Sequence, residues 1–289
     1  MVKRILILGS SGLTGTILVS LLNEYKIFTT YHSKKYHKDD IYLDILSYKS
    51  LKNSFELAVP DIVINLTGIY KNLEFCEQNK KLVMNMNCNS LKTISELANK
   101  FNSFLVTVST DQVFDGVKGN YKECDKTCPI NHYGKSKAEG EKVVQNIAKK
   151  YCIIRTSMLW GKNNSRKTFS EFILDEIKDK NELKLIQDQI TSPTYLQNFC
   201  EMFYEVVKKE VFGIIHLSGP EKLSRYEFGR KLLEFSGLDK EKIIPSKRNE
   251  FIFGKYFPKD TSLNTDKAKE ILDVQPEKID ISIKKYIQN

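Results

Sequence analysis

The sequence predicts an α/β fold in which helices cover both faces of a doubly wound parallel sheet, with a smaller, mostly C-terminal α/β lobe attached. In the first half of the 289-residue chain, short apolar runs alternate with stretches of helical periodicity, which is typical of strands joined by crossover helices. Stretches within the runs, such as Ile5–Leu8 and Ile62–Ile64, are continuously apolar, as in a sheet that is covered on both faces. A glycine-rich turn follows the first run directly.

The pattern predicts five strands in the first half and one later strand. They are expected at Arg4–Leu8, Ile27–Thr30, Asp61–Leu66, Phe104–Ser109, Tyr151–Arg155 and Gly213–Leu217. Apolar residues recur at helical spacing in 13–22, 82–100, 168–180, 196–209, 224–235 and 265–272. We expect residues 1–160 to form the sheet domain, with 195–218 returning to it, and residues 161–289 to form mainly the smaller lobe.

Composition narrows the class of protein. Apolar and charged contents of 41% and 28% are ordinary for a globular chain, and no apolar run is long enough for a membrane span or a signal peptide. The six cysteines lack metal-ligand spacing, so free thiols, no bound metal and a cytoplasmic location are expected. The net charge of +9 suits anionic ligands, but the lysines are scattered without base-stacking aromatics, which argues against nucleic acid.

The segment Gly9-Ser10-Ser11-Gly12-Leu13-Thr14-Gly15 is a G-x-x-G-x-x-G turn between the first strand and a helix. Gly9 suits the tight turn, Gly12 the approach of a pyrophosphate to the backbone, and Gly15 close packing of helix on strand. The helix N-terminus offers N–H donors to phosphate. The pattern predicts a Rossmann-type dinucleotide site, with Ser11 and Leu13 also at the cofactor.

The second strand predicts NADPH as the cofactor, with NADH as the alternative. An NAD site usually carries an acidic residue at the end of this strand. Here the chain reads Thr29-Thr30-Tyr31-His32-Ser33-Lys34-Lys35, which suits a 2′-phosphate, although both lysines fit a solvated loop equally. The remaining cofactor residues are expected to be His32, Ser33, Lys34, Asp44, Ile45, Leu66, Thr67 and Gly68.

Tyr133 and Lys137 lie four residues apart, which on a helix places them on one face. A tyrosine with a free pKa of about 10 becomes a useful proton donor to a carbonyl when a nearby cation stabilises its phenolate. The pair alone is a weak signal. It gains weight from Thr110, which follows the Phe104–Ser109 run and is expected at the carboxyl end of the sheet, where ligands bind.

Together these segments resemble the extended short-chain dehydrogenase/reductase family, and within it the dTDP-4-dehydrorhamnose reductases. The motifs similar to that group are Ser109–Gly116, Tyr133–Glu141, Arg155–Ser157, Asp188–Thr194, Gly213–Gly219 and Ser262–Lys267. The resemblance covers nearly the whole chain. It implies a catalytic triad of Thr110, Tyr133 and Lys137, of which the last two also contact the cofactor.

The departures from the family pattern fall at the expected sugar pocket. Gln112 stands where the reductases have tyrosine, and Met158 stands where they often have tryptophan. We expect the substrate to contact Thr110, Asp111, Gln112, Met158 and Arg155. Arg155, Lys162 and Arg166 are candidates for its diphosphate, and each is equally consistent with an ordinary surface or strand-end charge.

The resemblance implies NADPH-dependent reduction of the C4 keto group of a nucleotide-linked 4-keto-6-deoxy sugar, as in dTDP-rhamnose and polysaccharide biosynthesis. Two alternatives stay open: a sugar-nucleotide epimerase, and a non-catalytic NADP-binding subunit like the regulatory β subunit of methionine adenosyltransferase. A dehydratase is disfavoured because Gln112 replaces its catalytic glutamate, and an amide cannot abstract a proton. The expected partner is the nucleotide sugar, without nucleic acid or membrane, and the chain is expected to be a monomer or homodimer.

Overall fold

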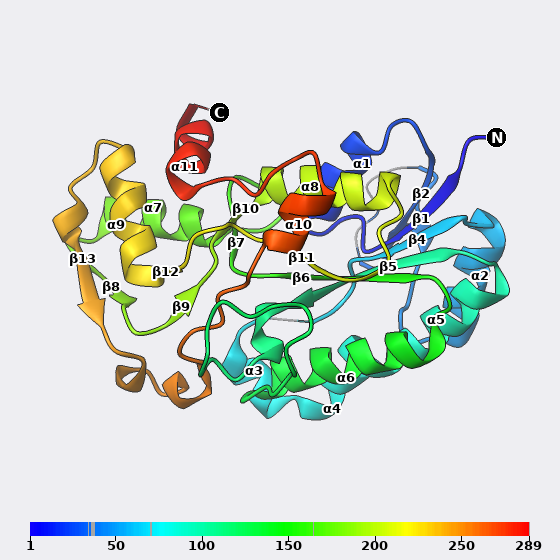
Figure 1. Ribbon diagram of the computed structural model, residues 1–289, viewed down its shortest axis with the longest axis horizontal. Helices are drawn as coiled ribbons and strands as arrows, with labels where there is room; N and C mark the ends of the chain where they lie inside the picture. The colour runs from blue at the N-terminus through cyan, green and yellow to red at the C-terminus, as the bar shows by residue number, and fades with distance from the viewer. Residues whose placement is uncertain (34, 36–37, 70, 164, 289) are drawn as a thin grey trace. The chain divides into compact units, whose positions relative to one another are not determined.

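The computed structural model describes residues 1–33, 35, 38–69, 71–163 and 165–288, which form two compact units (Figure 1). Unit 1 comprises residues 1–109, 132–154 and 203–215, and unit 2 comprises residues 110–131, 155–202 and 216–289. The predicted boundary at residue 160 is therefore corrected: residues 110–131 and 155–160 belong to unit 2. The later segment of unit 1 lies inside the range 195–218 expected to return to the sheet.

Unit 1 is built on a seven-stranded sheet, and the predicted α/β class is confirmed. Its strand order is β11-β6-β5-β4-β1-β2-β3, and β1 pairs in parallel with both β2 and β4. The strand order reverses between β1 and β4, so the carboxyl ends of these two strands form the switch point at which such sheets bind ligands. The strands are β1 (Arg4–Leu8), β2 (Lys26–Tyr31), β3 (Ile41–Tyr42), β4 (Ile62–Asn65), β5 (Phe104–Thr110), β6 (Tyr151–Thr156) and β11 (Gly213–His216).

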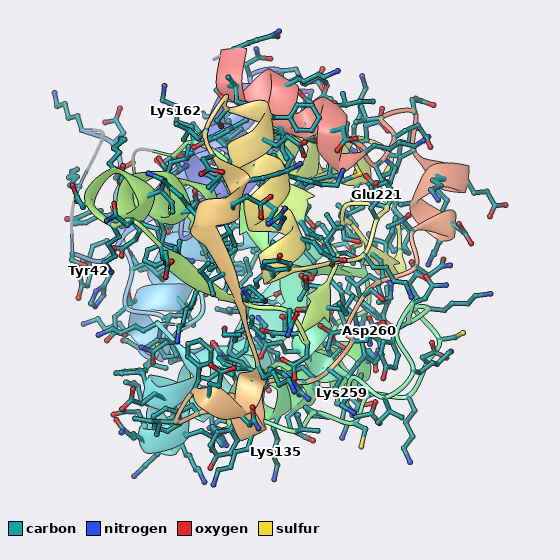
Figure 2. All side chains as sticks on the ribbon, turned by 90° about the vertical axis from the view of Figure 1, so that its left-hand side faces the viewer. Tyr42, Lys135, Lys162, Glu221, Lys259 and Asp260 are labelled. Atoms are coloured by element: carbon teal, nitrogen blue, oxygen red, sulfur yellow. The ribbon has the colours of Figure 1, made fainter. Side chains whose placement is uncertain are left out.

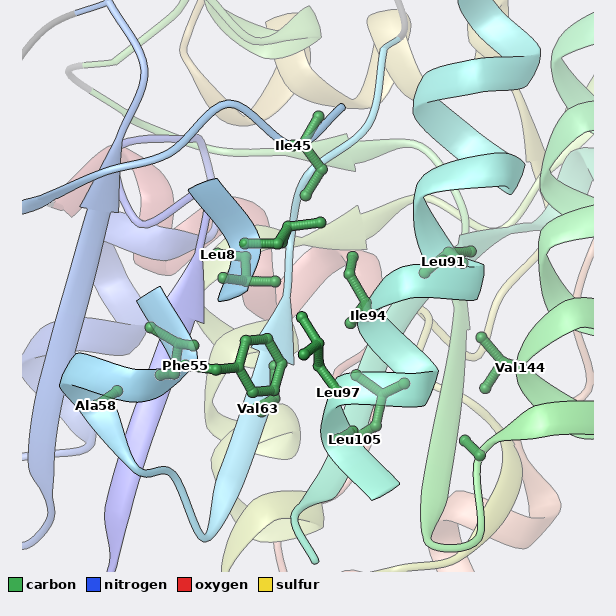
Figure 3. Packing of buried hydrophobic residues seen from close by; sticks show 14 of the residues in the cluster. Leu8, Ile45, Phe55, Ala58, Val63, Leu91, Ile94, Leu97, Leu105 and Val144 are labelled. Carbon is green, nitrogen blue, oxygen red and sulfur yellow. The ribbon is translucent and has the colours of Figure 1, made fainter. Parts of the chain in front are cut away.

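Alternate side chains of the central strands enter different layers of the core. Leu6, Leu8, Val63 and Leu105 pack with helices α2, α5 and α6 on one face of the sheet (Figure 3). Figure 1 shows α1 on the opposite face, where the buried Ile5, Ile7 and Ile64 are directed by the two-residue period of a strand. The helices are α1 (Gly15–Leu21), α2 (Tyr48–Ala58), α3 (Leu73–Gln78), α4 (Lys80–Met84), α5 (Ser90–Lys100) and α6 (His132–Ile147).

The predicted helix 82–100 is divided in the structure. A π-helical turn, Asn85–Asn89, separates α4 from α5. Such turns are rare and frequently occur at functional sites. This turn directs the Asn87 side chain into the interior, where it is 2% exposed.

Unit 2 has small sheets and a helical core around Trp160. Three two-stranded pairs, β7–β10, β8–β13 and β9–β12, accompany helices α7, α9 and α11, whose apolar faces enclose the indole. The strands are β7 (Leu159–Trp160), β8 (Leu183–Ile186), β9 (Ile190–Thr191), β10 (Thr194–Tyr195), β12 (Leu223–Ser224) and β13 (Ile243–Ser246). The remaining helices are α7 (Phe169–Asp179), α8 (Leu196–Lys208, shared with unit 1), α9 (Arg225–Phe235), α10 (Asp266–Ile271) and α11 (Ile279–Gln288).

Truncation of Phe228 tests this second core. Phe228 is fully buried, and its ring centroid lies 5.2 Å from that of Trp160 and 5.8 Å from that of Phe169. We expect Phe228→Ala to lower the free energy of unfolding by about 3–5 kcal/mol, measured by urea denaturation, because it leaves a cavity. The matched variant Phe172→Ala removes a ring that is 37% exposed and is expected to cost about 1 kcal/mol or less. Equal losses for the two variants would contradict the assignment of this core.

Two further observations concern membrane-spanning helices and cysteines. Among the described residues, no helix is long and apolar enough to cross a membrane. All six cysteines fall within the described part of the chain, and none of them forms a disulfide bond. Four of them are buried, whereas Cys124 and Cys128 are exposed.

Candidate active site

The glycine loop after β1 has the backbone that the sequence predicts. Gly9 has φ 87°, a conformation that side-chain-bearing residues rarely adopt. A Cβ atom on Gly15 would lie 2.4 Å from the Ser10 carbonyl oxygen, so only glycine lets α1 begin this close to the loop. A Cβ atom on Gly12 would meet only the Gly9 carbonyl oxygen, at 3.3 Å, and would otherwise enter open space. The loop therefore leaves room for a pyrophosphate against its backbone.

Hydrogen bonds fix this loop to the neighbouring strand ends. The Gly9 N–H donates to Thr30 Oγ1 at 3.1 Å, and Ser10 Oγ donates to the Thr30 carbonyl at 2.9 Å. Thr67, after β4, lies against Gly9, since a Cβ atom there would be 3.2 Å from its methyl group. The structure thus brings the predicted residues Gly9 and Thr67 together at the switch point. Thr30 is 1% exposed and serves the loop instead of a ligand.

The end of β2 presents the residues expected near the cofactor's adenosine. His32 and Ser33 are exposed, and the His32 ring stacks on Tyr42 with a centroid distance of 6.1 Å. The predicted Lys34 lies outside the described residues. The sequence analysis missed Asp40, a buried carboxylate that accepts a hydrogen bond from the Thr29 hydroxyl.

Two residues after β3 were also predicted at the cofactor, and they differ. Asp44 is half-buried, and its Oδ1 accepts from the Leu46 N–H at 3.0 Å. Ile45 is 6% exposed and belongs to the hydrophobic core of unit 1. Its side chain is used in packing, and its contact with the cofactor stays a prediction.

Helix α6 carries the tyrosine–lysine pair on one face. Tyr133 is half-buried, and Lys137 is 8% exposed, with its Nζ donating to the Val108 carbonyl at 2.6 Å. Burial lowers the pKa of Lys137 from 10.5 to about 8, against the opposing charge of Glu141. The ammonium is therefore held at the end of β5, and its proton can be lost near neutral pH.

Asn87, which the sequence analysis missed, connects three segments around this pair. Its Oδ1 accepts from the Ile69 N–H at 2.8 Å, and its Nδ2 donates to the Ile69 carbonyl at 3.2 Å and to Ser136 Oγ at 3.1 Å. Ser136 Oγ in turn donates to the Tyr133 carbonyl at 2.7 Å. Asn87 thus ties α6 to the segment after β4. An asparagine inside a helical pattern gave no signal of this role.

Thr110 is the last residue of β5 and the first of unit 2, where it belongs to a cluster of hydroxyl groups around Asp111. Thr110 Oγ1 donates to Asp111 Oδ1 at 3.0 Å. Ser157 Oγ and Thr261 Oγ1 donate to Asp111 Oδ2 at 2.8 and 2.6 Å. Asp111 was predicted at the substrate, but it is 4% exposed and its side chain forms hydrogen bonds with protein hydroxyls. Ser157 and Thr261 were missed because they lie 46 and 150 residues away along the chain.

Gln112 and Met158, two of the positions that depart from the family pattern, lie in unit 2. Gln112 is half-buried, and its side-chain oxygen accepts from Asn131 Nδ2 at 2.9 Å; the same Nδ2 donates to the Tyr256 carbonyl at 3.0 Å. Met158 is half-buried and has φ 27°, a strained conformation for a residue with a side chain. Strain of this kind is concentrated at functional sites.

The three predicted diphosphate cations are not brought together. Arg155 is 2% exposed, donates to the Glu123 carbonyl at 3.2 Å and lies over the Phe114 ring at 5.1 Å, so the structure gives it an interior role in unit 2. Lys162 and Arg166 line a separate pocket of about 640 Å³ beside α7. In Figure 2, Lys162 is labelled at the upper left and Asp260, the neighbour of Thr261, at the lower right.

Comparison with known proteins shows the family. Residues 3–289 match the family model described as the RmlD substrate binding domain. A dTDP-4-dehydrorhamnose reductase of Aggregatibacter actinomycetemcomitans is 31% identical over 78% of this chain and 76% of its own. The chain belongs to the RmlD family. The predicted resemblance to dTDP-4-dehydrorhamnose reductases is thereby confirmed.

Two further relatives are similar to this chain over most of their length. The Bacillus subtilis spore coat polysaccharide biosynthesis protein SpsK is 31% identical over 82% of this chain and 80% of its own. The crystal structure of a Bacillus anthracis dTDP-4-dehydrorhamnose reductase in complex with NADP superposes with a TM-score of 0.88 at 26% identity, covering 100% of this chain and 99% of that one. Because the Aggregatibacter actinomycetemcomitans and Bacillus anthracis relatives are named reductases, the prediction that this chain is an NAD(P)-dependent oxidoreductase is confirmed. Among the described residues, no group of His, Cys, Asp or Glu forms a metal site.

Proposed function

We propose that this RmlD-family chain is an NADPH-dependent reductase that acts on the C4 keto group of a nucleotide-linked 4-keto-6-deoxy sugar. The observation that carries the proposal is the α6 pair: Tyr133 shares a helix face with Lys137, and the Lys137 ammonium is held on the Val108 carbonyl. A phenol beside a fixed cation is suited to donate a proton to an oxygen that gains negative charge.

The residues of unit 1 fit a dinucleotide. The open side of Gly12 and the N–H groups at the start of α1 suit a pyrophosphate. The exposed His32 and Ser33 suit a 2′-phosphate, as does Lys35, whose Nζ lies 5.7 Å from the Tyr31 ring centroid. The NADP in the Bacillus anthracis relative supports the same choice. When bound, NADPH supplies the hydride.

Each member of the triad has a distinct task. Tyr133 gives its proton to the oxygen at C4 as negative charge develops there. Lys137 stabilises the phenolate that remains and holds ribose hydroxyls of the cofactor. Thr110 donates a hydrogen bond to the same carbonyl oxygen, which stabilises the developing alkoxide. We propose that the half-buried side chains of Gln112 and Met158 line the sugar pocket and determine which sugars it accepts.

The test is consumption of NADPH by the full chain, followed by absorbance, with a panel of nucleotide-linked 4-keto-6-deoxy sugars. We expect turnover with at least one 4-keto sugar, no turnover with the corresponding 4-hydroxy sugars, and slower turnover with NADH. Tight NADPH binding without turnover across the panel would contradict the proposal and favour a cofactor-binding regulatory subunit. Interconversion of sugars without consumption of NADPH would favour an epimerase.

A further inference from the structure

Asp111 is a buried carboxyl group. Among the described residues, its side chain forms hydrogen bonds with hydroxyl groups and with no cationic side chain. Three hydroxyl groups, those of Thr110, Ser157 and Thr261, lie 2.6–3.0 Å from its oxygens. The charge that acts on it is that of Arg225, whose guanidinium donates to Gln189 at 3.2 Å and lies over the Phe169 ring. The protonation state of Asp111 therefore decides whether Thr110 donates its proton to Oδ1 or accepts one from it.

A hydroxyl group has one proton to donate, which limits Thr110. Thr110 Oγ1 already accepts from the Gln112 N–H at 3.3 Å. If Asp111 is ionised, it can only accept, so the Thr110 proton points to Asp111 Oδ1 and is not available to a substrate. If Asp111 carries its proton on Oδ1, it donates to Thr110 Oγ1, and the Thr110 proton is released toward a ligand.

We propose that Asp111 is a positioning residue that keeps its proton in the reactive state and thereby turns the Thr110 hydroxyl toward the substrate carbonyl. This inference rests on the proposed function for its consequence in turnover. Asp111 keeps its proton throughout: it sets the direction of one hydrogen bond, while Tyr133 supplies the proton that the sugar gains.

The surroundings of Asp111 support the neutral form. Burial raises the pKa of Asp111, against the opposing effects of the Thr261, Ser157 and Thr110 hydroxyls and of Arg225. An ionised carboxylate with no hydrogen-bonded cation is costly in an interior. The Oδ2 atom still accepts from Ser157 and Thr261 in the neutral form, since the proton resides on Oδ1. Ser157 is itself fixed, because its Oγ accepts from the Ser192 N–H at 3.2 Å.

Asparagine at position 111 imitates the neutral acid permanently. Its NH₂ group can donate to Thr110 while its carbonyl accepts from Ser157 and Thr261. We expect Asp111→Asn to keep kcat within about fivefold of the wild type, whereas Asp111→Ala, which leaves Thr110 without this partner, loses roughly tenfold or more. Circular dichroism and NADPH affinity establish that both variants are folded. A folded Asp111→Asn protein that loses as much activity as Asp111→Ala would overturn the proposal.

Infrared spectroscopy of the cofactor-free protein tests the proton without any turnover. We expect a carbonyl band of a protonated carboxylic acid at the pH of the activity assay, lost in Asp111→Asn and retained in Asp115→Asn. Asp115 is the matched control because hydrogen bonds, chiefly from Tyr121, hold its pKa below the usual range. Thr261→Val removes a donor to the ionised form and should raise the pH at which the band disappears.

The two measurements separate the failure of this inference from the failure of the proposed function. A wild-type protein without the band, at the pH where it would be active, overturns the role of Asp111 whatever the enzyme reduces. A wild-type protein that shows the band but turns over no keto sugar overturns the proposed function, while the neutral state of Asp111 stands.

Discussion

Tyr133→Phe is expected to reduce turnover by about 10²–10⁴-fold while leaving NADPH affinity unchanged. The substitution removes one oxygen from a half-buried ring on α6, so the helix and its packing stay intact. The loss follows because the oxygen at C4 then has no acid to protonate it. Steady-state kcat and the dissociation constant of NADPH, measured by fluorescence titration, are the two readouts.

Tyr48→Phe is the matched control for this substitution. Tyr48 begins α2 and is 59% exposed, so the same loss of a hydroxyl is expected to change neither readout. Turnover by Tyr133→Phe at the wild-type rate would remove Tyr133 from the mechanism. A matching loss of NADPH affinity would instead indicate that the hydroxyl serves binding.

Lys137→Met is the second variant with a large expected effect. Moving a tyrosine pKa from about 10 toward 7 takes roughly 4 kcal/mol of electrostatic stabilisation, so losing the ammonium should lower kcat by roughly 10³-fold at pH 7. In the wild type, raising the pH should have the same effect, because it removes the positive charge of Lys137. The pKa of Lys137 lies at about 8, so turnover should fall as the pH rises through that value. A pH profile of kcat measures this limb.

The stability of the protein gives an independent check on Lys137. Between pH 8 and 10.5 the unfolded chain binds a proton at Lys137 that the folded chain has released, so this residue makes stability rise with pH across that window. The wild type should therefore gain up to about 3 kcal/mol relative to Lys137→Met between these limits, measured by urea denaturation at each pH. A constant difference between the two proteins would contradict the lowered pKa.

The sheet and its cofactor loop could be predicted from the sequence because their signals are local. Apolar runs such as Arg4–Leu8 coincide with strands, Gly9 has a backbone conformation that favours glycine, and Gly15 allows a close approach that a side chain would prevent. The spacing of Tyr133 and Lys137 identifies their shared helix face for the same reason.

The surroundings of the triad could not be predicted, because long-range contacts create them. Thr261 reaches Asp111 across 150 residues, and Asn87 acts through a π-helical turn inside what reads as one continuous helix. In the sequence Arg155 resembles an ordinary strand-end cation, and only the structure shows its contacts with the Glu123 carbonyl and the Phe114 ring. The sequence alone does not distinguish whether the apolar side chain of Ile45 packs in the core or contacts the cofactor. In the structure it belongs to the hydrophobic core of unit 1.

The central claim is that hydride reaches C4 of a keto sugar while Tyr133 protonates the oxygen. The most direct measurement is the transfer of deuterium from NADPH that carries deuterium at both positions of the nicotinamide C4 to a nucleotide-linked 4-keto-6-deoxy sugar, followed by mass spectrometry and NMR of the product. We expect one deuterium at C4 of the sugar for each NADPH consumed, and almost none with Tyr133→Phe. A product without deuterium at C4, or no product from a protein that binds NADPH tightly, would contradict this claim.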